Sequence, residues 1–520
     1  MPTDIQAPSI AYLPLLPILI VLGVALAGVL VEALVPAEHR RLTQVALAVA
    51  GLAAAFGAVI YLANDNTSQL VAQDAIAIDG PTLLLQGVLC VLGIGSVLLL
   101  SERRLDQGGG AVVSQAANPP GSREDLRLAD SQHVQTEVYP LAMFALGGML
   151  LFPACNNLLL SFVALEVLSL PLYLMAGLAR RRRLLSQEAA VKYFLLGAFA
   201  SAFFLYGVAL IYGYAGSVDL GKVLDATAVT GKSDNLLYLG IAMLGVGLLF
   251  KIGAVPFHSW TPDVYQGSPT PVTALMASCT KIAAFGALLR IFYVGFGTTQ
   301  WDWRPMIWII AILTMVAGAV LAVTQTDVKR MLAYSSVAHT GFILVGLGAL
   351  SASGHASRDG LSGALFYLLA YGFTTLASFA VVTLVRDSTG EATHLAQWAG
   401  LGRRSPMVAG VFAFLLFALA GIPLTSGFVA KFAVFKAGIE GDATALVVVG
   451  VVASAVTAFF YARVVVLMFF EEPSADGPTV AIPGIATAVT IAFGVAVTLI
   501  LGVLPQVALD WANDASVFIR

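Results

Sequence analysis

Charged residues are scarce in this 520-residue sequence. Asp, Glu, Lys and Arg make up 11 % of it, whereas soluble domains usually carry about 25 %, and 59 % of the residues are hydrophobic. So few polar groups cannot cover a water-facing surface, which excludes a soluble globular protein. The net charge of −3 also gives no electrostatic reason to expect nucleic acid as a partner.

Signatures of cofactor and metal chemistry are missing as well. The three cysteines, Cys90, Cys155 and Cys279, match no disulfide or metal-ligand spacing. Gly245 and Gly247 are not followed by the third glycine of a dinucleotide fingerprint. We therefore expect no metal and no cofactor in this chain. Residues 1–9 have no basic segment and include the acidic Asp4, so we expect the first apolar run to be an anchor rather than a cleaved signal peptide.

Long apolar runs dominate the sequence. A run of roughly 20 apolar residues spans a bilayer as a helix, whereas membrane barrels use short alternating strands. The sequence therefore predicts an all-α polytopic membrane protein with about fourteen transmembrane helices. The predicted spans are 9–34, 42–63, 80–100, 137–154, 157–178, 188–214, 235–257, 271–297, 303–325, 329–350, 361–386, 406–438, 443–470 and 482–504.

The basic residues predict the orientation of these spans. Most Lys and Arg residues outside the spans fall in connections on one side, which is the cytoplasmic side if both termini face outward. The chain divides into an N-terminal region of three transmembrane helices (1–100), a flexible cytoplasmic loop (101–136), two five-helix units (137–300 and 301–470) and a C-terminal helix with its tail (471–520).

Two apolar runs are predicted to be broken helices. Residues 235–270 and 406–438 are each too long for one unbroken span, and they contain the helix breakers Pro256, Gly421 and Pro423. These runs belong to the seventh and twelfth spans. The odd offset of five predicts two inverted repeats, spans four to eight and spans nine to thirteen, as in many transporters. The alternative is that each break only kinks a packed helix.

A few charged residues stand inside the spans, where a charge costs several kcal/mol. They are Glu166, Lys192, Lys251, Lys281 and Lys431. Burial disfavours a lysine ammonium and a nearby carboxylate favours it, so lysine can take up and release a proton, whereas arginine stays protonated. The pattern predicts a proton relay. Two structural alternatives stay open: an ion pair of Glu166 with Lys281 that locks two helices, and a pair of Lys192 with Glu188 four residues earlier.

Two histidines join these residues as possible auxiliary relay groups. His258 follows the first break and His339 lies about ten residues into its span, and histidine titrates near neutral pH. The alternative is that each is a hydrogen-bonded core residue. Three further cations, Arg290, Lys436 and Arg463, lie toward the ends of spans, and we expect their long side chains to reach the membrane interface.

Five motifs then resemble a known family. They lie at residues 165–173, 188–194, 255–270, 329–336 and 421–432, and the most specific is Val-Pro-Phe-His-Ser-Trp-Thr-Pro-Asp-Val-Tyr-Gln-Gly-Ser-Pro-Thr at 255–270. Together they resemble the antiporter-like subunits of respiratory complex I, the proton-translocating NADH–quinone oxidoreductase. Lys431 and the Val-Tyr-Gln-Gly segment at 264–267 make the subunit N family the nearest of these.

The resemblance implies roles for the buried charges. Glu166 and Lys251 would form a modulating pair, Lys192 would join the relay, Lys281 would be its centre, and Lys431 would lie toward the proton exit or a neighbouring subunit. The expected partners are the other membrane-arm subunits of complex I, including the neighbouring antiporter-like subunit and small membrane subunits. Flavin, iron–sulfur clusters and quinone would be held by partner subunits, and the expected location is the bacterial cytoplasmic membrane.

Two other functions share this fold and these lysines. One is a subunit of a multi-subunit cation/proton antiporter, which has no redox partner. The other is the photosynthetic counterpart of complex I, which uses plastoquinone and ferredoxin. The Val-Tyr-Gln-Gly segment at 264–267 favours complex I over most antiporter subunits and separates the photosynthetic form less well.

Overall fold

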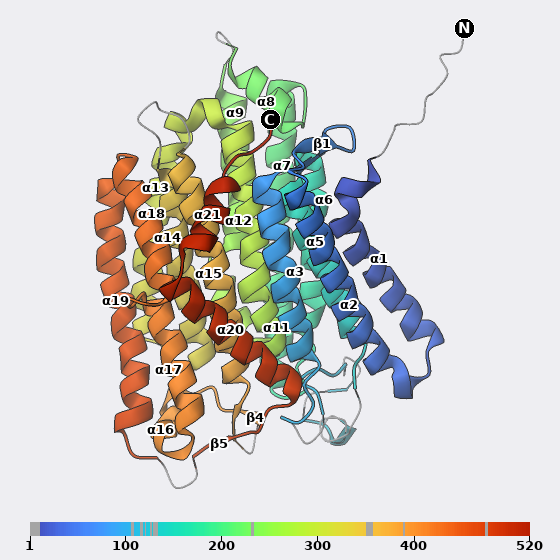
Figure 1. Ribbon diagram of the computed structural model, residues 1–520, viewed down its shortest axis with the longest axis vertical. Helices are drawn as coiled ribbons and strands as arrows, with labels where there is room; N and C mark the ends of the chain where they lie inside the picture. The colour runs from blue at the N-terminus through green and yellow to red at the C-terminus, as the bar shows by residue number, and fades with distance from the viewer. Residues whose placement is uncertain are drawn as a thin grey trace.

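The chain forms a bundle of long helices that run side by side, with short connections at both ends (Figure 1). The computed structural model describes residues 11–105, 109–114, 118–119, 121–124, 127, 134–229, 233–349, 357–387, 390–473 and 477–520. Within these residues the architecture is helical throughout the body of the protein, which confirms the predicted all-α class, whereas the two inverted repeats stay a prediction.

Every predicted span contains helix. The long helices are α1 Tyr12–Leu34, α2 Ala37–Asn64, α3 Gly80–Leu100, α5 Val138–Leu151, α6 Leu158–Ala176, α7 Arg183–Ala215, α9 Asn235–Ile252, α13 Gln300–Val323, α14 Val328–Gly348, α15 Arg358–Val382, α17 Pro406–Ala420, α18 Ser426–Glu440, α19 Thr444–Phe470 and α20 Ile485–Val503. The eighth span joins α11 Thr270–Leu275, a π-helical turn Met276–Thr280, α12 Lys281–Arg290 and a second π-helical turn Ile291–Gly295. Twelve spans in the described residues are long and apolar enough to cross a membrane, and Val138–Ala154 and Pro406–Ala420 are shorter. Fourteen crossings stay a prediction.

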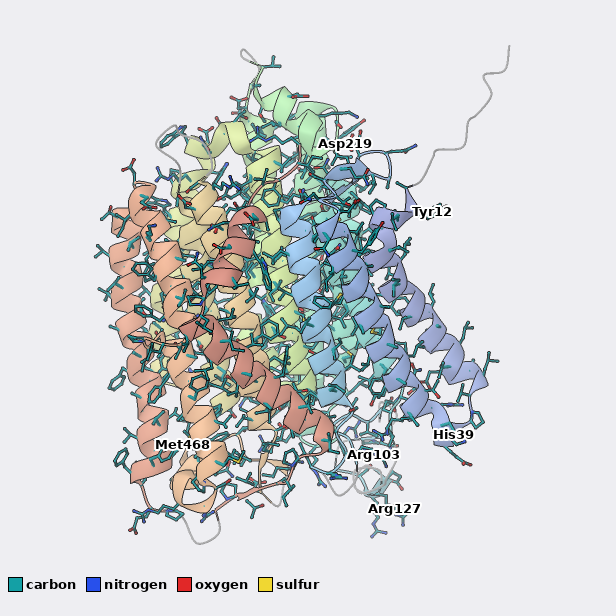
Figure 2. All side chains as sticks on the ribbon, viewed as in Figure 1. Tyr12, His39, Arg103, Arg127, Asp219 and Met468 are labelled. Carbon is teal, nitrogen blue, oxygen red and sulfur yellow. The ribbon has the colours of Figure 1, made fainter. Side chains whose placement is uncertain are left out.

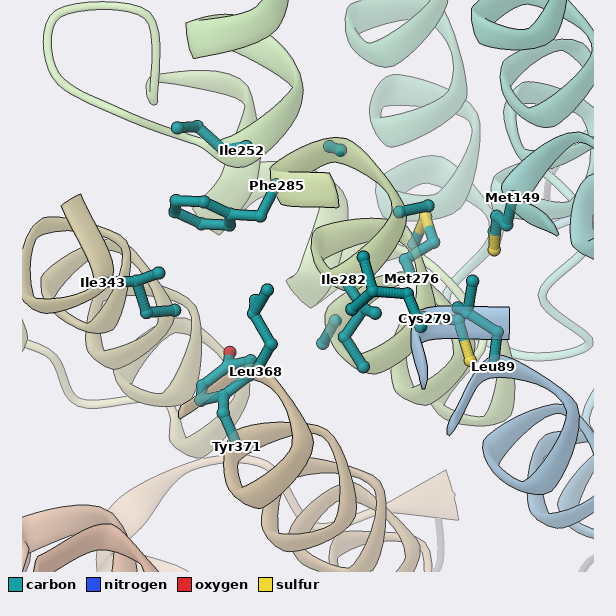
Figure 3. Close-up of a cluster of buried hydrophobic side chains, with 14 of the residues drawn as sticks. Leu89, Met149, Ile252, Met276, Cys279, Ile282, Phe285, Ile343, Leu368 and Tyr371 are labelled. Atoms are coloured by element: carbon teal, nitrogen blue, oxygen red, sulfur yellow. The ribbon is translucent and has the colours of Figure 1, made fainter. Parts of the chain in front are cut away.

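The centre of the bundle is formed by the eighth span together with α14 and α15. In Thr270–Gly295 and in α15, every residue of the most apolar stretch is buried inside the protein, and in α14 94 % of these residues are buried. The corresponding share is only 33 to 39 % in α1, α2, α19 and α20. Figure 3 shows side chains of these central helices, Ile282, Ile343 and Leu368 among them, meeting in one apolar cluster. A helix that is apolar on all sides is buried in this way.

The two predicted breaks are present. Helix α9 ends at Ile252, and the chain runs without regular helix to α10, Trp260–Gly267. Helix α17 ends at Ala420, and α18 begins at Ser426. Each break starts with a glycine in the left-handed region, Gly253 at φ +73° and Gly421 at φ +85°, where residues with a Cβ are strained. The prediction of discontinuous helices is therefore confirmed.

Short elements close the two ends of the bundle. Two antiparallel sheets are among them: β1 Gln69–Val71 pairs with β2 Ile76–Ile78, and the second sheet has the order β4 Gly390–Glu391, β3 Val385–Asp387 and β5 Thr479–Val480. The short helices are α8 Leu220–Thr227, α16 Leu401–Arg404 and α21 Gln506–Asp514. The 3-10 turns are Phe152–Ala154, Gly297–Thr299 and Leu395–Trp398. The strands were not predicted from the sequence because they are only two or three residues long.

The two ends of the bundle differ in the residues they carry. Tyr12 and Asp219 lie at one end, and His39, Arg103 and Arg127 lie at the other (Figure 2). The C-terminus lies at the end that carries Tyr12 (Figure 1). The arrangement agrees with the predicted placement of both termini on one side, and which side faces the cytoplasm stays a prediction.

The predicted loop 101–136 is anchored where the structure describes it, whereas residues 106–108, 115–117, 120, 125–126 and 128–133 lie outside the described residues. The Glu102 carboxylate accepts hydrogen bonds from the backbone N–H of Gly484 and the hydroxyl of Thr487, both at 2.7 Å, and so caps the start of α20. Burial alone would raise the pKa of Glu102. The two hydrogen bonds, together with two more from the backbone N–H groups of Arg104 and Arg103, outweigh the effect of burial, so the pKa lies below its ordinary value.

Arg290 does not reach a membrane interface, so that expectation is wrong. Its side chain is fully buried and forms an ion pair with Asp79 of 2.6 Å, Nη2 to Oδ1. The same guanidinium donates to the carbonyl of Pro153 and the hydroxyl of Thr82, and the ring of Phe518 lies 4.8 Å from its centre. The pair joins the start of α3 to the end of α12. Lys436 and Arg463 are exposed.

We expect Arg290→Met to lower the free energy of unfolding by about 3 to 5 kcal/mol, because Asp79 would remain as an uncompensated buried charge. Thermal unfolding of the detergent-solubilised protein measures the change. The matched control is Arg463→Met at an exposed cation, which we expect to shift the midpoint little. Equal shifts for the two variants would contradict a stabilising role for the buried pair.

Candidate functional site

Lys251 lies in the last turn of α9, directly before the first break. Its ammonium donates hydrogen bonds to the hydroxyls of Ser169 (2.8 Å) and Tyr193 (3.2 Å), and only 4 % of the residue is exposed. The rings of Tyr193 and Tyr173 lie 5.3 and 5.8 Å from Nζ, so their π faces also stabilise the cation. Lys251 is thus a buried amine whose direct partners are neutral.

Glu166 lies three residues before Ser169 on α6, near Lys251 but not in contact with it. The two interact through their charges, yet no ion pair within 4.0 Å joins them in the described residues. The Oε1 atom of Glu166 is buried and has no hydrogen-bond partner in the described part of the chain. The carboxylate therefore acts on the lysine at a distance.

Lys281 is the first residue of α12, directly after the π-helical turn. Its ammonium donates to the carbonyl (2.5 Å) and hydroxyl (2.6 Å) of Ser336 and to the hydroxyl of Thr340 (2.8 Å), both on α14. The ring of Tyr371 lies 5.2 Å from Nζ. In the described residues, no carboxylate lies within ion-pair distance of Lys281, so the alternative of a locking pair with Glu166 finds no support.

Lys431 lies on α18, just after the second break. It donates to the carbonyl of Ala420, the last residue of α17, at 2.7 Å and to the hydroxyl of Ser454 on α19 at 2.9 Å. Its side chain also needs Gly421, because a Cβ there would come 3.0 to 3.4 Å from three of its atoms. The lysine forms part of the wall of an open cavity of about 650 Å³ between α18 and α19.

His339 connects the two central lysines by position. It is 2 % exposed and lies on α14, whose Ser336 and Thr340 bind Lys281 and whose Phe342 ring lies 4.8 Å from Nζ of Lys431. Nδ1 lies 2.7 Å from the hydroxyl of Tyr367 and Nε2 lies 3.4 Å from that of Tyr461. Its hydrogen bonds fit a core histidine, and its place between two amines also fits a relay group.

Lys192 and His258 make no described contact with Lys251, Lys281, Lys431 or His339. Lys192 is 40 % exposed at its side chain and forms ion pairs of 2.6 Å with Glu188 and with Asp263 of α10, as its structural alternative requires. Arg330 of α14 binds the other oxygen of Asp263, also at 2.6 Å.

His258 has a buried Nδ1 without a partner in the described residues, and its ring lies 6.3 Å from that of Tyr334.

The neutral partners of the three lysines and of His339 were not predicted from the sequence. They are Ser169, Tyr193, Ser336, Thr340, Ser454, Tyr367 and Tyr461. A signal exists for some of them. Ser169 follows Glu166 by three residues, and Ser336 and Thr340 are four apart, so each of these pairs shares one helix face. The partners on α19 and α15 could be found only from the packing of distant helices.

The arrangement suits proton transfer better than ion-pair anchoring. Hydroxyls and carbonyls can hold an ammonium, and a hydroxyl can also donate to a neutral amine, so both states of the lysine find partners. A carboxylate in direct contact would hold the charged state. Each of the three buried lysines is thus bound by neutral oxygens, which suit both its charged and its neutral state.

Comparison with known proteins identifies the family. The model for "NADH:quinone oxidoreductase/Mrp antiporter, TM" matches residues 155–457, more than half of the chain. The chain belongs to this family. It is 64 % identical over 512 residues to the NADH-quinone oxidoreductase subunit N of Parafrankia sp., and the match covers 98 % of this chain and 96 % of the relative.

Two solved structures have the same fold as this chain. A chain of respiratory complex I from Thermus thermophilus is 32 % identical, with a TM-score of 0.76 over 95 % of this chain and 98 % of that one. A chain of the Mrp complex from Dietzia sp. has a TM-score of 0.79 over 96 % of this chain and 97 % of that one, at 23 % identity, which shows the fold alone.

We expect Lys281→Met to leave the stability of this family member unchanged or to raise it by up to about 2 kcal/mol, because the buried ammonium has no carboxylate to offset its desolvation. Thermal unfolding in detergent measures the effect beside Arg290→Met. A loss as large as that of Arg290→Met would contradict the interpretation and would make Lys281 a structural residue.

Proposed function

We propose that the chain is a proton-translocating membrane-arm subunit of an NADH–quinone oxidoreductase, driven by redox chemistry in other subunits. The observation that carries the proposal is the 64 % identity to a subunit N over nearly the whole length of both chains. A relative from Rhodococcus opacus with the same name is 60 % identical over 535 residues, again over almost the whole chain.

The proposed proton path follows the buried amines in the order Lys251, Lys281, His339 and Lys431. Support comes from the neutral oxygens that hold each lysine and from the position of His339 between the last two. Glu166 would modulate the first step. Its negative charge favours the protonated form of Lys251, so a movement that separates the two favours proton release toward the next amine.

The partners follow from the same proposal. Other complex I subunits would surround the chain, among them the neighbouring antiporter-like subunit and small membrane subunits, and the flavin, iron–sulfur clusters and quinone would be theirs. The open cavity beside Lys431 fits the expected position of this lysine near a neighbouring subunit. The bacterial sources of the relatives support the cytoplasmic membrane as the location. The proposed orientation, with both termini outside, rests on the basic residues in the connections between the spans.

The alternative functions have weaker support. The likeness to a chain of the Mrp complex is a likeness of fold, at 23 % identity, so it carries no argument for cation exchange. Lys192 remains a predicted relay residue, although its ion pairs with Glu188 and Asp263 favour a structural role at the edge of the path.

Lys281→Ala and Lys251→Ala should each reduce proton pumping by at least about tenfold, because each removes a group that carries the proton. The measurement is NADH-driven acidification of membrane vesicles that contain the assembled complex. Lys436→Ala is the matched control, since Lys436 is exposed at its side chain and pairs loosely with Glu440 at 3.8 Å. Normal pumping by an assembled Lys281→Ala complex would contradict the relay.

Purification of the native assembly tests whether the chain is a subunit of an NADH–quinone oxidoreductase. We expect the chain to co-purify with a peripheral arm whose flavin and iron–sulfur clusters are reduced by NADH, which visible and electron paramagnetic resonance spectra detect. Recovery in a Na⁺-dependent assembly without redox centres would overturn the proposal in favour of a cation/proton antiporter. Reduction by ferredoxin but not by NADH would favour the photosynthetic counterpart.

A further inference from the structure

A basic pocket of about 60 Å³ lies where four connections of the bundle meet. They are the link between α6 and α7, the link between α10 and α11, the first turn of α14 and the β3–β4 hairpin. Strand β4 lies at the lower end of the bundle in Figure 1, the end that carries Arg103 and Arg127 in Figure 2. The charged residues among its described lining are five cations and one acid: Arg180, Arg181, Arg182, Lys329, Arg386 and Glu391. Positive charge is therefore in large excess on its walls.

Lys329 and Arg182 bring two like charges to this pocket, and each has only neutral direct partners. Lys329 is 3 % exposed, and its ammonium donates to the carbonyl of Ser268 at 2.7 Å. Arg182 is exposed and donates to the hydroxyl of Thr393 at 2.7 Å and to a carbonyl of β4 at 2.8 Å. The carbonyl of Thr393 in turn accepts the N–H of Val328, the neighbour of Lys329. No carboxylate in the described residues lies within 4.0 Å of either cation, so an anion between them would offset their repulsion.

The hydroxyl of Ser268 on the wall of the basic pocket has no partner in the described part of the chain. The residue is 2 % exposed, its N–H binds the carbonyl of Val264, and its own carbonyl accepts from Lys329. Native proteins rarely leave a buried hydroxyl without a protein or water partner, because its lost hydration is not replaced. A free hydroxyl beside an ammonium can donate to an anion, so this second observation also indicates a missing acceptor in the pocket.

The loop that follows α3 holds the arginine run of the pocket in place. Arg180 is 2 % exposed; its backbone N–H donates to the carbonyl of Ala111 at 3.0 Å, and its Nε donates to that of Gly110 at 2.6 Å. Gly390 in the hairpin leaves room for Arg181, because a Cβ at this glycine would come 3.1 Å from Cδ of that side chain. Cations that are held before a ligand arrives lose less conformational entropy when they bind it.

The size and the donors of the basic pocket fit a phosphate group. A volume of about 60 Å³ holds about four water molecules, which is roughly the space of one tetrahedral anion with four oxygens. Guanidinium and ammonium groups bind phosphate oxygens through charge-assisted hydrogen bonds. Four oxygens can meet donors from several elements at once, whereas a carboxylate offers only two. The one acid on the wall, Glu391, accepts a hydrogen bond from the hydroxyl of Thr270 and leaves the cations in excess.

We propose that the basic pocket binds one phosphate group, held by Lys329, Arg182 and the hydroxyl of Ser268. The group belongs either to free inorganic phosphate or to the headgroup of an anionic phospholipid, since basic pockets between membrane helices bind such headgroups. Bound there, it would tie the link between α6 and α7 to the link between α10 and α11 and to the first turn of α14. The site is independent of the proposed function, because none of its three ligands carries a proton in the proposed path.

Binding measurements on the detergent-solubilised full chain test the site. Equilibrium dialysis with radiolabelled inorganic phosphate at constant ionic strength measures one source, and native mass spectrometry with phosphatidylglycerol, beside phosphatidylcholine, measures the other. We expect one ligand per chain, and Arg182→Gln and Ser268→Ala should each weaken its binding by about tenfold, because each removes a hydrogen bond to a charged group. The matched control is Arg403→Gln on α16, which removes the same charge from an exposed cation that lies 3.5 Å from Glu472, and which should bind normally.

The outcomes distinguish the two sources of the phosphate group. Saturable binding of inorganic phosphate that Arg182→Gln and Ser268→Ala weaken would support a free anion. Retention of phosphatidylglycerol in preference to phosphatidylcholine, weakened by the same two variants, would support a lipid headgroup. Equal weakening by Arg403→Gln would show attraction by net charge alone and would overturn the inference. Binding of neither ligand, or native affinity in both pocket variants, would overturn it as well.

A direct observation decides the matter if the pocket variants do not fold. A cryo-electron microscopy map of the native assembly at about 2 Å should show tetrahedral density whose oxygens lie about 2.6 to 3.0 Å from Nζ of Lys329 and from Oγ of Ser268. A map of that quality with only separate water peaks in the basic pocket, or with no peak there, would overturn the inference.

Discussion

The burial of lysine ammonium groups against neutral oxygens is the interaction around which the rest of this structure is arranged. A charge at membrane depth is costly, so the protein must supply the partners that water would give. It does so for Lys251, Lys281 and Lys431 with hydroxyls, carbonyls and aromatic rings from other helices. These contacts hold the three lysines inside the bundle, where each is at most 5 % exposed.

The two helix breaks follow from the same constraint. Backbone that is not helical can lie at membrane depth only inside protein or beside water. Each break begins with a left-handed glycine and lies next to a lysine: Gly253 follows Lys251, and Gly421 packs against Lys431. In the second break the last residue of α17, Ala420, provides its carbonyl as a partner for Lys431. The breaks thus create polar surroundings for the amines.

Arg290 and Lys192 differ from Lys251, Lys281 and Lys431 in their partners. Arg290 is matched directly with Asp79, and Lys192 is matched with Glu188 and Asp263. A direct carboxylate contact holds the cation in its charged state and fixes two elements together. The central lysines lack such a contact in the described residues, and Glu166 acts only from a distance. We propose that this contrast separates cations that anchor helices from cations that exchange protons.

The sequence by itself determined the membrane class, the two broken helices and the identity of the buried lysines, because apolar runs, glycine and proline breakers and costly charges are local features. It also offered two interpretations of Lys192 and a wrong one of Arg290. Only the tertiary structure decided which oxygens hold each amine and that Arg290 meets Asp79, since these partners lie tens to hundreds of residues away. Such contacts depend on how distant helices pack against one another, and the local pattern of residues along the sequence does not predict this packing.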